Sequence, residues 1–215
     1  MSRIDKHEIR RSIVDVLRFL KRYYQYRDLS SITGIHVTAL SRYKQGYIFP
    51  NYETALKLYS KLKPLLIKQI RKIIFENKTS EIFRPEILKI LAKIILYEII
   101  GLRITKILAF EDTVPLAIAT SLQTNIPFVI ITTTANTNYE SYLTIPIRIE
   151  NIYINYYLPR KLINRRDDIL FIDIETTEIK NKVLKRIEEA KKIKITKKIL
   201  LEELFKNDDC QRNLV

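Results

Sequence analysis

Residues 170 to 181, L-F-I-D-I-E-T-T-E-I-K-N, place an aspartate, further acids and paired threonines between an apolar run and a lysine-rich segment. Backbone N–H groups at the start of a helix can hold a phosphate, so a strand, a short polar loop and a helix in this order suit an anion-binding loop. The candidate ligand residues are Asp173, Thr176, Thr177 and Glu178. A second interpretation is structural, since Thr176 or Thr177 can cap the following helix and Glu178 suits its first turn.

A second polar loop precedes this one in the chain. The segment A-F-E-D-T-V-P-L-A-I-A-T-S-L, residues 109 to 122, carries Glu111 and Thr113 between an apolar run and a helical pattern. The next apolar run, N-I-P-F-V-I-I, is followed by three threonines. Both loops therefore follow predicted strands.

The elements that must position these loops alternate between strand and helix. The pattern predicts helices at 85–100, 115–122 and 180–191, strands at 104–110, 128–132 and 169–174, and a hairpin turning at Glu150-Asn151. Such alternation predicts an α/β domain with a mainly parallel sheet covered on both faces.

The two loops and their strands resemble those of type I phosphoribosyltransferases over about residues 82 to 200. In that family the first loop binds pyrophosphate and the second binds the 5-phosphate of phosphoribosyl pyrophosphate (PRPP). Ile172 stands where the first of two acids is usual, Asp173 is the second, and Glu178 and Thr113 replace loop glycines. A carboxylate at the phosphate position would repel the ligand. We therefore expect a vestigial loop of Glu111, Thr113, Asp173, Thr176, Thr177 and Glu178, with no turnover or binding of PRPP. The alternative is another small ligand held by Asp173, Thr176 and Thr177.

The N-terminal third has helical periodicity throughout. Helices are expected at 8–24, in two short runs between 26 and 46 that break at Gly34, from Asn51 to Leu62, and from Pro64 toward Phe75. Gly34 can adopt the left-handed conformation of a tight turn, with Ile32, Ile35 and Leu40 as the internal core. The polar stretch E-N-K-T-S-E, residues 76 to 81, is the expected domain boundary.

The segment from Leu29 to Gly46, with Pro50 and the helix after it, resembles the helix-turn-helix of the Cro/C1 repressor family over about residues 7 to 63. The resemblance implies a recognition helix at 37–45, with His36 in place of the usual serine or threonine cap. The expected DNA-binding residues are Arg27, His36, Val37, Thr38, Ser41, Arg42, Lys44 and Tyr47. Use of the same helices for protein contacts is the alternative.

Charge favours polyanionic partners. Lys and Arg number 38 against 24 Asp and Glu, for a net charge of +14 and a pI near 9.7. Residues 1 to 63 hold thirteen of the basic and five of the acidic residues. Duplex DNA is the expected partner, with RNA or an acidic membrane less favoured. The lysine-rich run at 185–198 predicts a solvated helix face and an edge strand, or a second nucleic-acid patch.

Cysteine and histidine content limits the cofactors. The single Cys210 excludes an internal disulfide and a zinc site of several thiolates, and two histidines exclude a histidine-based metal cluster. No signal peptide or membrane-spanning segment is evident, so a cytoplasmic, chromosome-associated location is expected. We expect no metal, no cofactor and no catalytic residue.

These inferences combine into one expectation for the chain. It comprises a helix-turn-helix domain at 1–63, a connecting helix and linker at 64–81, and an α/β phosphoribosyltransferase-like domain at 82–215. The protein is expected to be a non-enzymatic transcriptional regulator that dimerises through its α/β domain. The alternative is a ligand-responsive regulator or a divergent phosphoribosyltransferase that still binds PRPP or a nucleotide.

Overall fold

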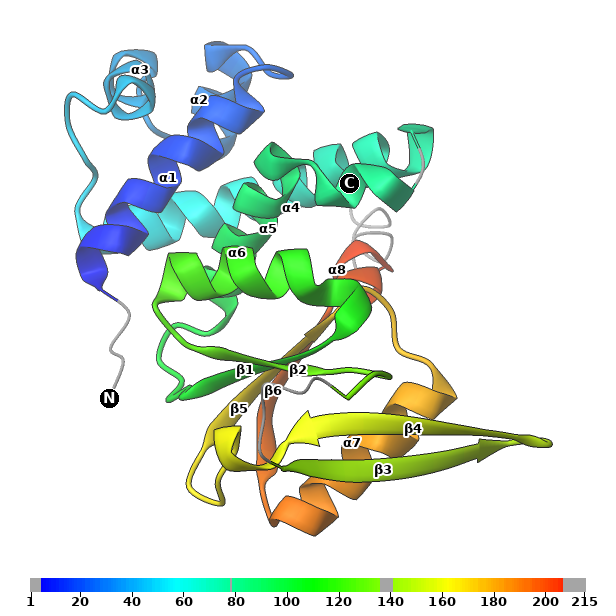
Figure 1. The fold of residues 1–215 in the computed structure, drawn as a ribbon. Coiled ribbons are helices and arrows are strands. Elements are labelled where there is room, and N and C mark those ends of the chain that lie inside the picture. Colours follow the sequence, from blue (N-terminus) through cyan, green and yellow to red (C-terminus); the bar gives the residue numbers. More distant parts are fainter. Residues whose placement is uncertain (1–4, 78, 136–140, 207–215) are drawn as a thin grey trace. The chain divides into compact units, whose positions relative to one another are not determined.

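A computed structural model describes residues 5–77, 79–135 and 141–206, and these divide into two compact units. The helical unit extends to residue 100 and includes residues 204–206 near the C-terminus. The α/β unit comprises residues 101–203 (Figure 1). The short helix α8 (Leu201–Lys206) is divided between them.

The helical unit contains five longer helices and one short 3-10 turn in its described residues. They are α1 (Lys6–Leu20), α2 (Tyr26–Thr33), α3 (Val37–Gln45), α4 (Tyr52–Asn77), η1 (Thr79–Phe83) and α5 (Pro85–Glu98). The apolar positions expected of the first helix, Ile9, Ile13, Val16, Leu17 and Leu20, are all buried, so one face of α1 forms core. None of the helices in the described part of the chain is long and apolar enough to cross a membrane.

Helix α4 differs from the two helices expected on either side of Pro64. It continues through Pro64 as one helix of 26 residues. Proline removes one backbone donor and crowds the preceding turn, which usually ends or kinks a helix. Here Leu62, Leu66 and Ile70 are fully buried on both sides of the proline, so continuous packing of one face offsets that cost.

The division between the units falls at residue 100, whereas the sequence predicted a boundary at residues 76 to 81. Helix α5 packs with the helical unit because its side chains complete that core. The Tyr97 hydroxyl donates to the Ile9 carbonyl and accepts from the Ser12 hydroxyl, both at 3.0 Å. Lys93, nearly inaccessible to solvent, lies 3.0 Å from the Asp15 carboxylate.

The turn between α2 and α3 has the expected glycine geometry but a different core. Gly34 adopts a left-handed conformation, with φ of 73°, and caps α2. Leu40 is buried as predicted, whereas Ile32 is 38% exposed and Ile35 is half-buried. Leu29 and Thr33 are buried instead, because residues one helical turn apart share a face and Ile32 is turned away from it.

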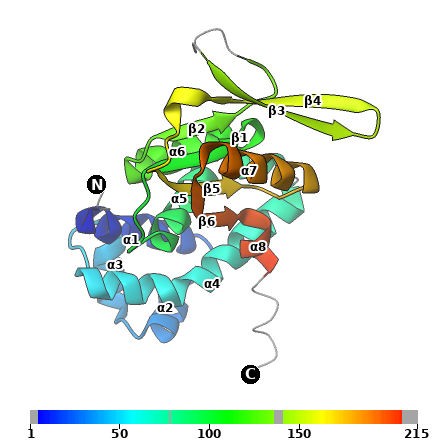
Figure 2. The same ribbon diagram turned by 90° about the horizontal axis from the view of Figure 1, so that it is seen from below.

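The α/β unit is built on a four-stranded parallel sheet. Its strands are β1 (Lys106–Phe110), β2 (Phe128–Ile131), β5 (Asp168–Asp173) and β6 (Lys194–Leu200), in the order β2-β1-β5-β6. Helix α6 (Val114–Thr124) connects β1 to β2, and α7 (Glu178–Lys191) connects β5 to β6. The two helices cover opposite faces of the sheet (Figures 1 and 2), as the sequence predicted.

An antiparallel hairpin joins the sheet on the side of α7. It consists of β3 (Tyr142–Ile149) and β4 (Ile152–Pro159), and a bridge from Thr132 to Tyr157 attaches it beyond the end of β2. Side chains from the sheet, the hairpin and the Val183, Leu184 and Ile187 face of α7 form one hydrophobic core.

Candidate functional site

The polar loops meet where the sheet changes winding direction. From β1 the chain passes through α6 to β2, whereas from β5 it passes through α7 to β6 on the other side. In open α/β sheets the carboxyl ends of the two strands at such a switch point form the usual ligand-binding crevice. The loop after β1, with the short turn η2 (Glu111–Thr113), and the loop after β5 therefore lie together.

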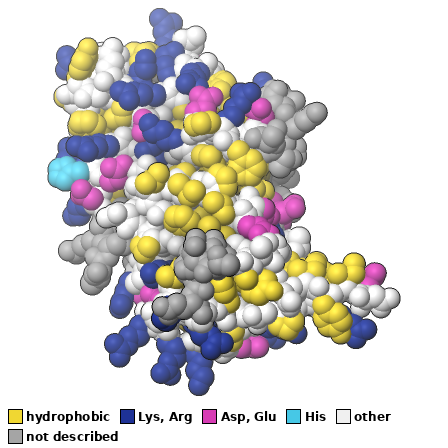
Figure 3. Space-filling model, viewed as in Figure 1, with side chains coloured by type: hydrophobic (Ala, Val, Ile, Leu, Met, Phe, Trp, Pro, Cys, Tyr) yellow, Lys and Arg dark blue, Asp and Glu magenta, His cyan; other side chains and the backbone are white. Residues whose placement is uncertain are grey.

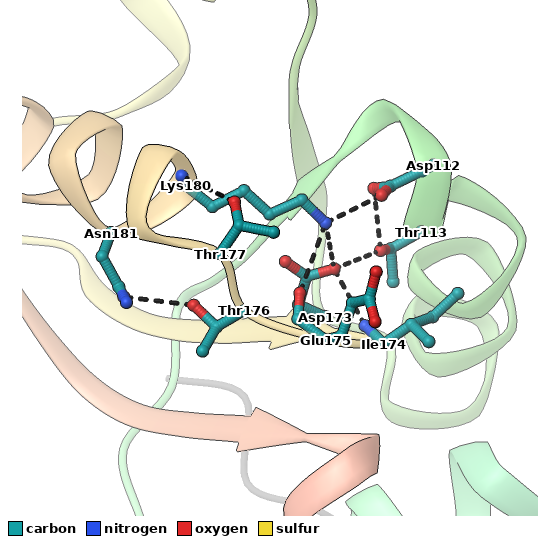
Figure 4. Close-up of polar contacts among 9 residues, drawn as sticks. All are labelled: Asp112, Thr113, Asp173, Ile174, Glu175, Thr176, Thr177, Lys180 and Asn181. Atoms are coloured by element: carbon teal, nitrogen blue, oxygen red, sulfur yellow. Dashed lines mark hydrogen bonds and ion pairs between the residues drawn. The ribbon is translucent and has the colours of Figure 1, made fainter. Parts of the chain in front are cut away.

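Asp173 is the centre of the cluster at this point. It ends β5 and is completely buried. Its Oδ1 accepts from the backbone N–H of Ile174 at 2.8 Å, from the Thr113 hydroxyl at 2.8 Å and from Lys180 Nζ at 2.9 Å (Figure 4). No donor among the described residues reaches the other oxygen, Oδ2. The carboxylate is thus held firmly on one side and has an unused acceptor on the other.

Lys180 supplies the positive charge of the site. It belongs to the first turn of α7, and its ammonium reaches the Asp112 carboxylate at 2.7 Å, Asp173 and the Glu175 carbonyl (Figure 4). It also lies 5.3 Å from the centre of the Phe110 ring. A lysine at the start of a helix opposes the helix dipole, so its contacts with two carboxylates must compensate for that position.

The environment shifts the ionisation of both groups. Burial raises the pKa of Asp173 above its ordinary value, although Lys180 and Thr113 act in the opposite direction. Burial lowers the pKa of Lys180, but the hydrogen bonds to Asp112 and Asp173 outweigh it and leave that pKa raised. The lysine is therefore firmly protonated at neutral pH, and the aspartate is the group whose charge is costly.

Glu178 does not occupy the loop. Its side chain is 81% exposed and pairs with Lys182 at 2.6 Å, one turn along α7. Thr177 caps α7 by accepting from the Lys180 backbone N–H, and Thr176 donates to Asn181. The structural role proposed for the threonines thus fits the geometry. The carboxylate that was expected to repel a phosphate points away from the loop, which removes that argument against a ligand.

The remaining predicted loop residues take different positions. Thr113 is buried and faces Asp173, so it forms part of the cluster. Glu111 turns toward the end of β2, where it accepts from the Thr133 backbone and hydroxyl. Burial and the charge of Glu111 raise the pKa of Tyr156, whose ring packs edge-on against Phe110.

Sequence reasoning missed Lys180 and Asp112 as site residues. Asp112 stands inside the quoted loop between Glu111 and Thr113, and Lys180 stands three residues after Thr177. A lysine in the first turn of a helix was the available signal, because cations are disfavoured there.

The residues expected to contact DNA lie on α2, α3 and the segment after it. Arg27, His36, Thr38, Arg42 and Tyr47 are exposed, and Val37, Ser41 and Lys44 are half-buried. His36 caps α3 by accepting from the Thr38 backbone N–H at 3.3 Å. His36, and not Thr38, therefore supplies the polar end of that helix.

Comparisons with known proteins identify the fold of the α/β unit. No family model and no curated protein matches the sequence. The chain is similar to adenine phosphoribosyltransferase from Rhodothermus marinus, with a TM-score of 0.53 and 14% identity over 63% of this chain and 85% of that one. The enzyme from Saccharomyces cerevisiae gives 0.51 and 13%, covering 66% and 93%. The chain therefore contains an α/β fold like that of phosphoribosyltransferases.

These similarities correct the prediction that the protein is not an enzyme. The solved proteins that share the fold are enzymes. The prediction depended on the replacement of two loop glycines, yet Glu178 lies outside the loop and Thr113 joins the cluster. The glycine pattern was thus an unsound basis for inferring lost chemistry.

Proposed function

We propose that the α/β unit is a divergent phosphoribosyltransferase that binds PRPP or a nucleotide at the carboxyl ends of β1 and β5. The observation that carries the proposal is the buried Asp173 carboxylate, which keeps an unused acceptor oxygen beside the Lys180 ammonium at the switch point of the sheet. The similarity to adenine phosphoribosyltransferases supports the same class of reaction.

The cluster offers complementary groups to a phosphorylated ribose. Asp173 Oδ2 can accept from a ribose hydroxyl, which would satisfy a buried acceptor that has no partner among the described residues. Asp112 is 53% exposed, so its carboxylate can leave Lys180 for water at little cost. The released ammonium N–H would then bind a phosphate oxygen and offset charge on a departing pyrophosphate.

The direct test measures binding and turnover together. PRPP at a hundredfold excess over its dissociation constant should stabilise the protein by about 2.7 kcal/mol, which a thermal melt detects. Incubation with PRPP and adenine should release pyrophosphate. Neither a melting shift nor pyrophosphate release in the unmodified protein would overturn the proposal.

Matched variants locate the effect. Lys180→Met should abolish the PRPP-dependent shift, whereas Lys182→Met on the same helix should keep it, because Lys182 pairs with the exposed Glu178 and not with Asp112 or Asp173. Equal losses in both variants would contradict a specific role for Lys180.

A second candidate function belongs to the helical unit, and we propose that α2 and α3 bind duplex DNA. Thr38 and Arg42 are exposed one turn apart on α3, and none of the residues predicted to contact DNA is buried. With roughly 6 to 10 phosphate contacts in a dimer, affinity should fall by about 10³ to 10⁵ between 50 and 200 mM salt. Arg42→Ala should relax sequence preference, and Lys44→Ala should weaken all sequences alike. Absence of duplex binding at low salt would exclude this function.

A further inference from the structure

A basic surface lies where α7 meets strand β3 and the connection between β4 and β5. Three neighbouring hollows of about 510, 400 and 460 Å³ follow this helix. The second and third hollows share Arg186 and Glu189, and the first and third share Ala190. Among the described residues that line them, eight carry a positive charge and one, Glu189, a negative charge. The helix spans about 20 Å, long enough to follow several phosphates of an extended strand.

Three exposed cations surround the first hollow, near the end of α7. Arg165, Arg166 and Lys192 are exposed around the first hollow, and none of them pairs with an acidic side chain in the described part of the chain. Lys191 donates to the Arg160 and Ile163 carbonyls, which holds the β4–β5 connection against the helix end. Burial and the nearby Arg160 charge lower the Lys191 pKa, so positive charge is crowded here. In Figure 3, Lys and Arg side chains gather at the lower end of the molecule.

An aromatic residue stands beside the second hollow. Arg148 lines that hollow with Lys182, Lys185 and Arg186. Directly across the hairpin from Arg148 is Tyr153, which is 68% exposed and lies under the Arg148 guanidinium at 5.7 Å. Figure 3 shows hydrophobic side chains along the projecting hairpin. An exposed aromatic ring next to a positively charged groove is the arrangement on which unpaired bases stack.

We infer that this surface, the α7 track, binds single-stranded nucleic acid. Arginine and lysine side chains of the hollows neutralise the phosphates, and Tyr153 stacks against a base. A duplex would present its bases already stacked and would leave Tyr153 without a role. The α7 track does not depend on the Asp173 cluster, because none of the residues that line its hollows belongs to that cluster.

The test uses the full-length protein and a fluorescent 12-nucleotide oligo-uridylate or oligo-thymidylate in anisotropy titrations at several salt concentrations. Replacing Arg165, Arg166 and Lys185 together by alanine should weaken binding and reduce the slope of log K against log salt by about 2, since each phosphate contact contributes about 0.7 for single strands. Tyr153→Ala should weaken binding roughly tenfold and leave the salt slope unchanged.

A charge-matched variant distinguishes binding at the α7 track from nonspecific electrostatic attraction of the oligonucleotide to the basic protein. Alanine at Lys57, Lys68 and Lys198 removes the same charge from exposed positions elsewhere and should leave the slope unchanged. Equal effects of the two triple variants would overturn the inference. Tighter binding to a duplex than to single strands, with Tyr153→Ala leaving both unchanged, would also overturn it. Thermal melts confirm that each variant is folded, and PRPP-dependent stabilisation should persist in all of them.

Discussion

Tyr59 and Tyr97 stack with ring centroids 3.7 Å apart, but their hydroxyls differ in hydrogen bonding. The Tyr59 hydroxyl is buried without a partner in the described residues, and burial raises its pKa far above the ordinary value. Burial also raises the pKa of Tyr97 to about 12, but its hydroxyl bonds to Ile9 and Ser12. Tyr59→Phe should therefore leave the free energy of unfolding unchanged or increase it, and Tyr97→Phe should reduce it by about 1 kcal/mol. Urea unfolding of the two variants measures the difference, and a larger loss for Tyr59→Phe would contradict it.

The Lys180 and Asp173 pair allows a double-mutant test of the site. Lys180→Met leaves a buried carboxylate without its cation, so at pH 7 it should cost about 3 kcal/mol. Adding Asp173→Asn should recover much of that loss. A raised aspartate pKa makes the single variant more stable as pH falls toward 4, since the folded state then binds the proton more tightly than the unfolded one. Additive effects at pH 7 would show that the two side chains are not coupled.

At the scale of elements, α5 is joined to α1 through Asp15. Burial raises the pKa of Asp15, but Lys93 and Lys89 outweigh this effect and leave that pKa lowered. The resulting stability is present above the unfolded pKa near 3.8 and is lost as pH falls through the lower folded value. Asp15→Asn should cost about 2 kcal/mol at pH 7, and the cost should shrink as the pH falls below 3.8. Glu86→Gln, which breaks the exposed pair with Arg22, is the control and should cost less than about 1 kcal/mol. A loss that stays the same as the pH falls would point to packing instead of charge.

At the scale of the whole molecule, we expect a homodimer formed through the α/β unit. Two DNA-binding units held one helical turn apart would gain affinity for a palindromic site. Leu122 and Ile118, one turn apart on α6, are 82% and 42% exposed, and apolar side chains this exposed are candidates for a subunit contact. Light scattering should give a dimer, and Leu122→Lys should give a monomer of unchanged helix content. A monomer in the unmodified protein would refute this prediction.

The sequence by itself determined the features that depend on local periodicity. The alternation of strands and helices after residue 100, the hairpin around Glu150, the left-handed Gly34 and the threonine cap of α7 follow from residue order and turn chemistry. The resemblance of the two loops to those of phosphoribosyltransferases indicated the fold that the solved structures support.

Only the tertiary structure decided which side chains meet. Lys180 and Asp112 are 68 residues apart and become partners because parallel strands β1 and β5 end at the same edge of the sheet. Glu178 leaves the loop because its position on α7 faces solvent, and α5 joins the helical unit because Tyr97 and Lys93 find their partners on α1. Such contacts depend on which faces of distant elements pack together, and periodicity within one segment does not specify that choice.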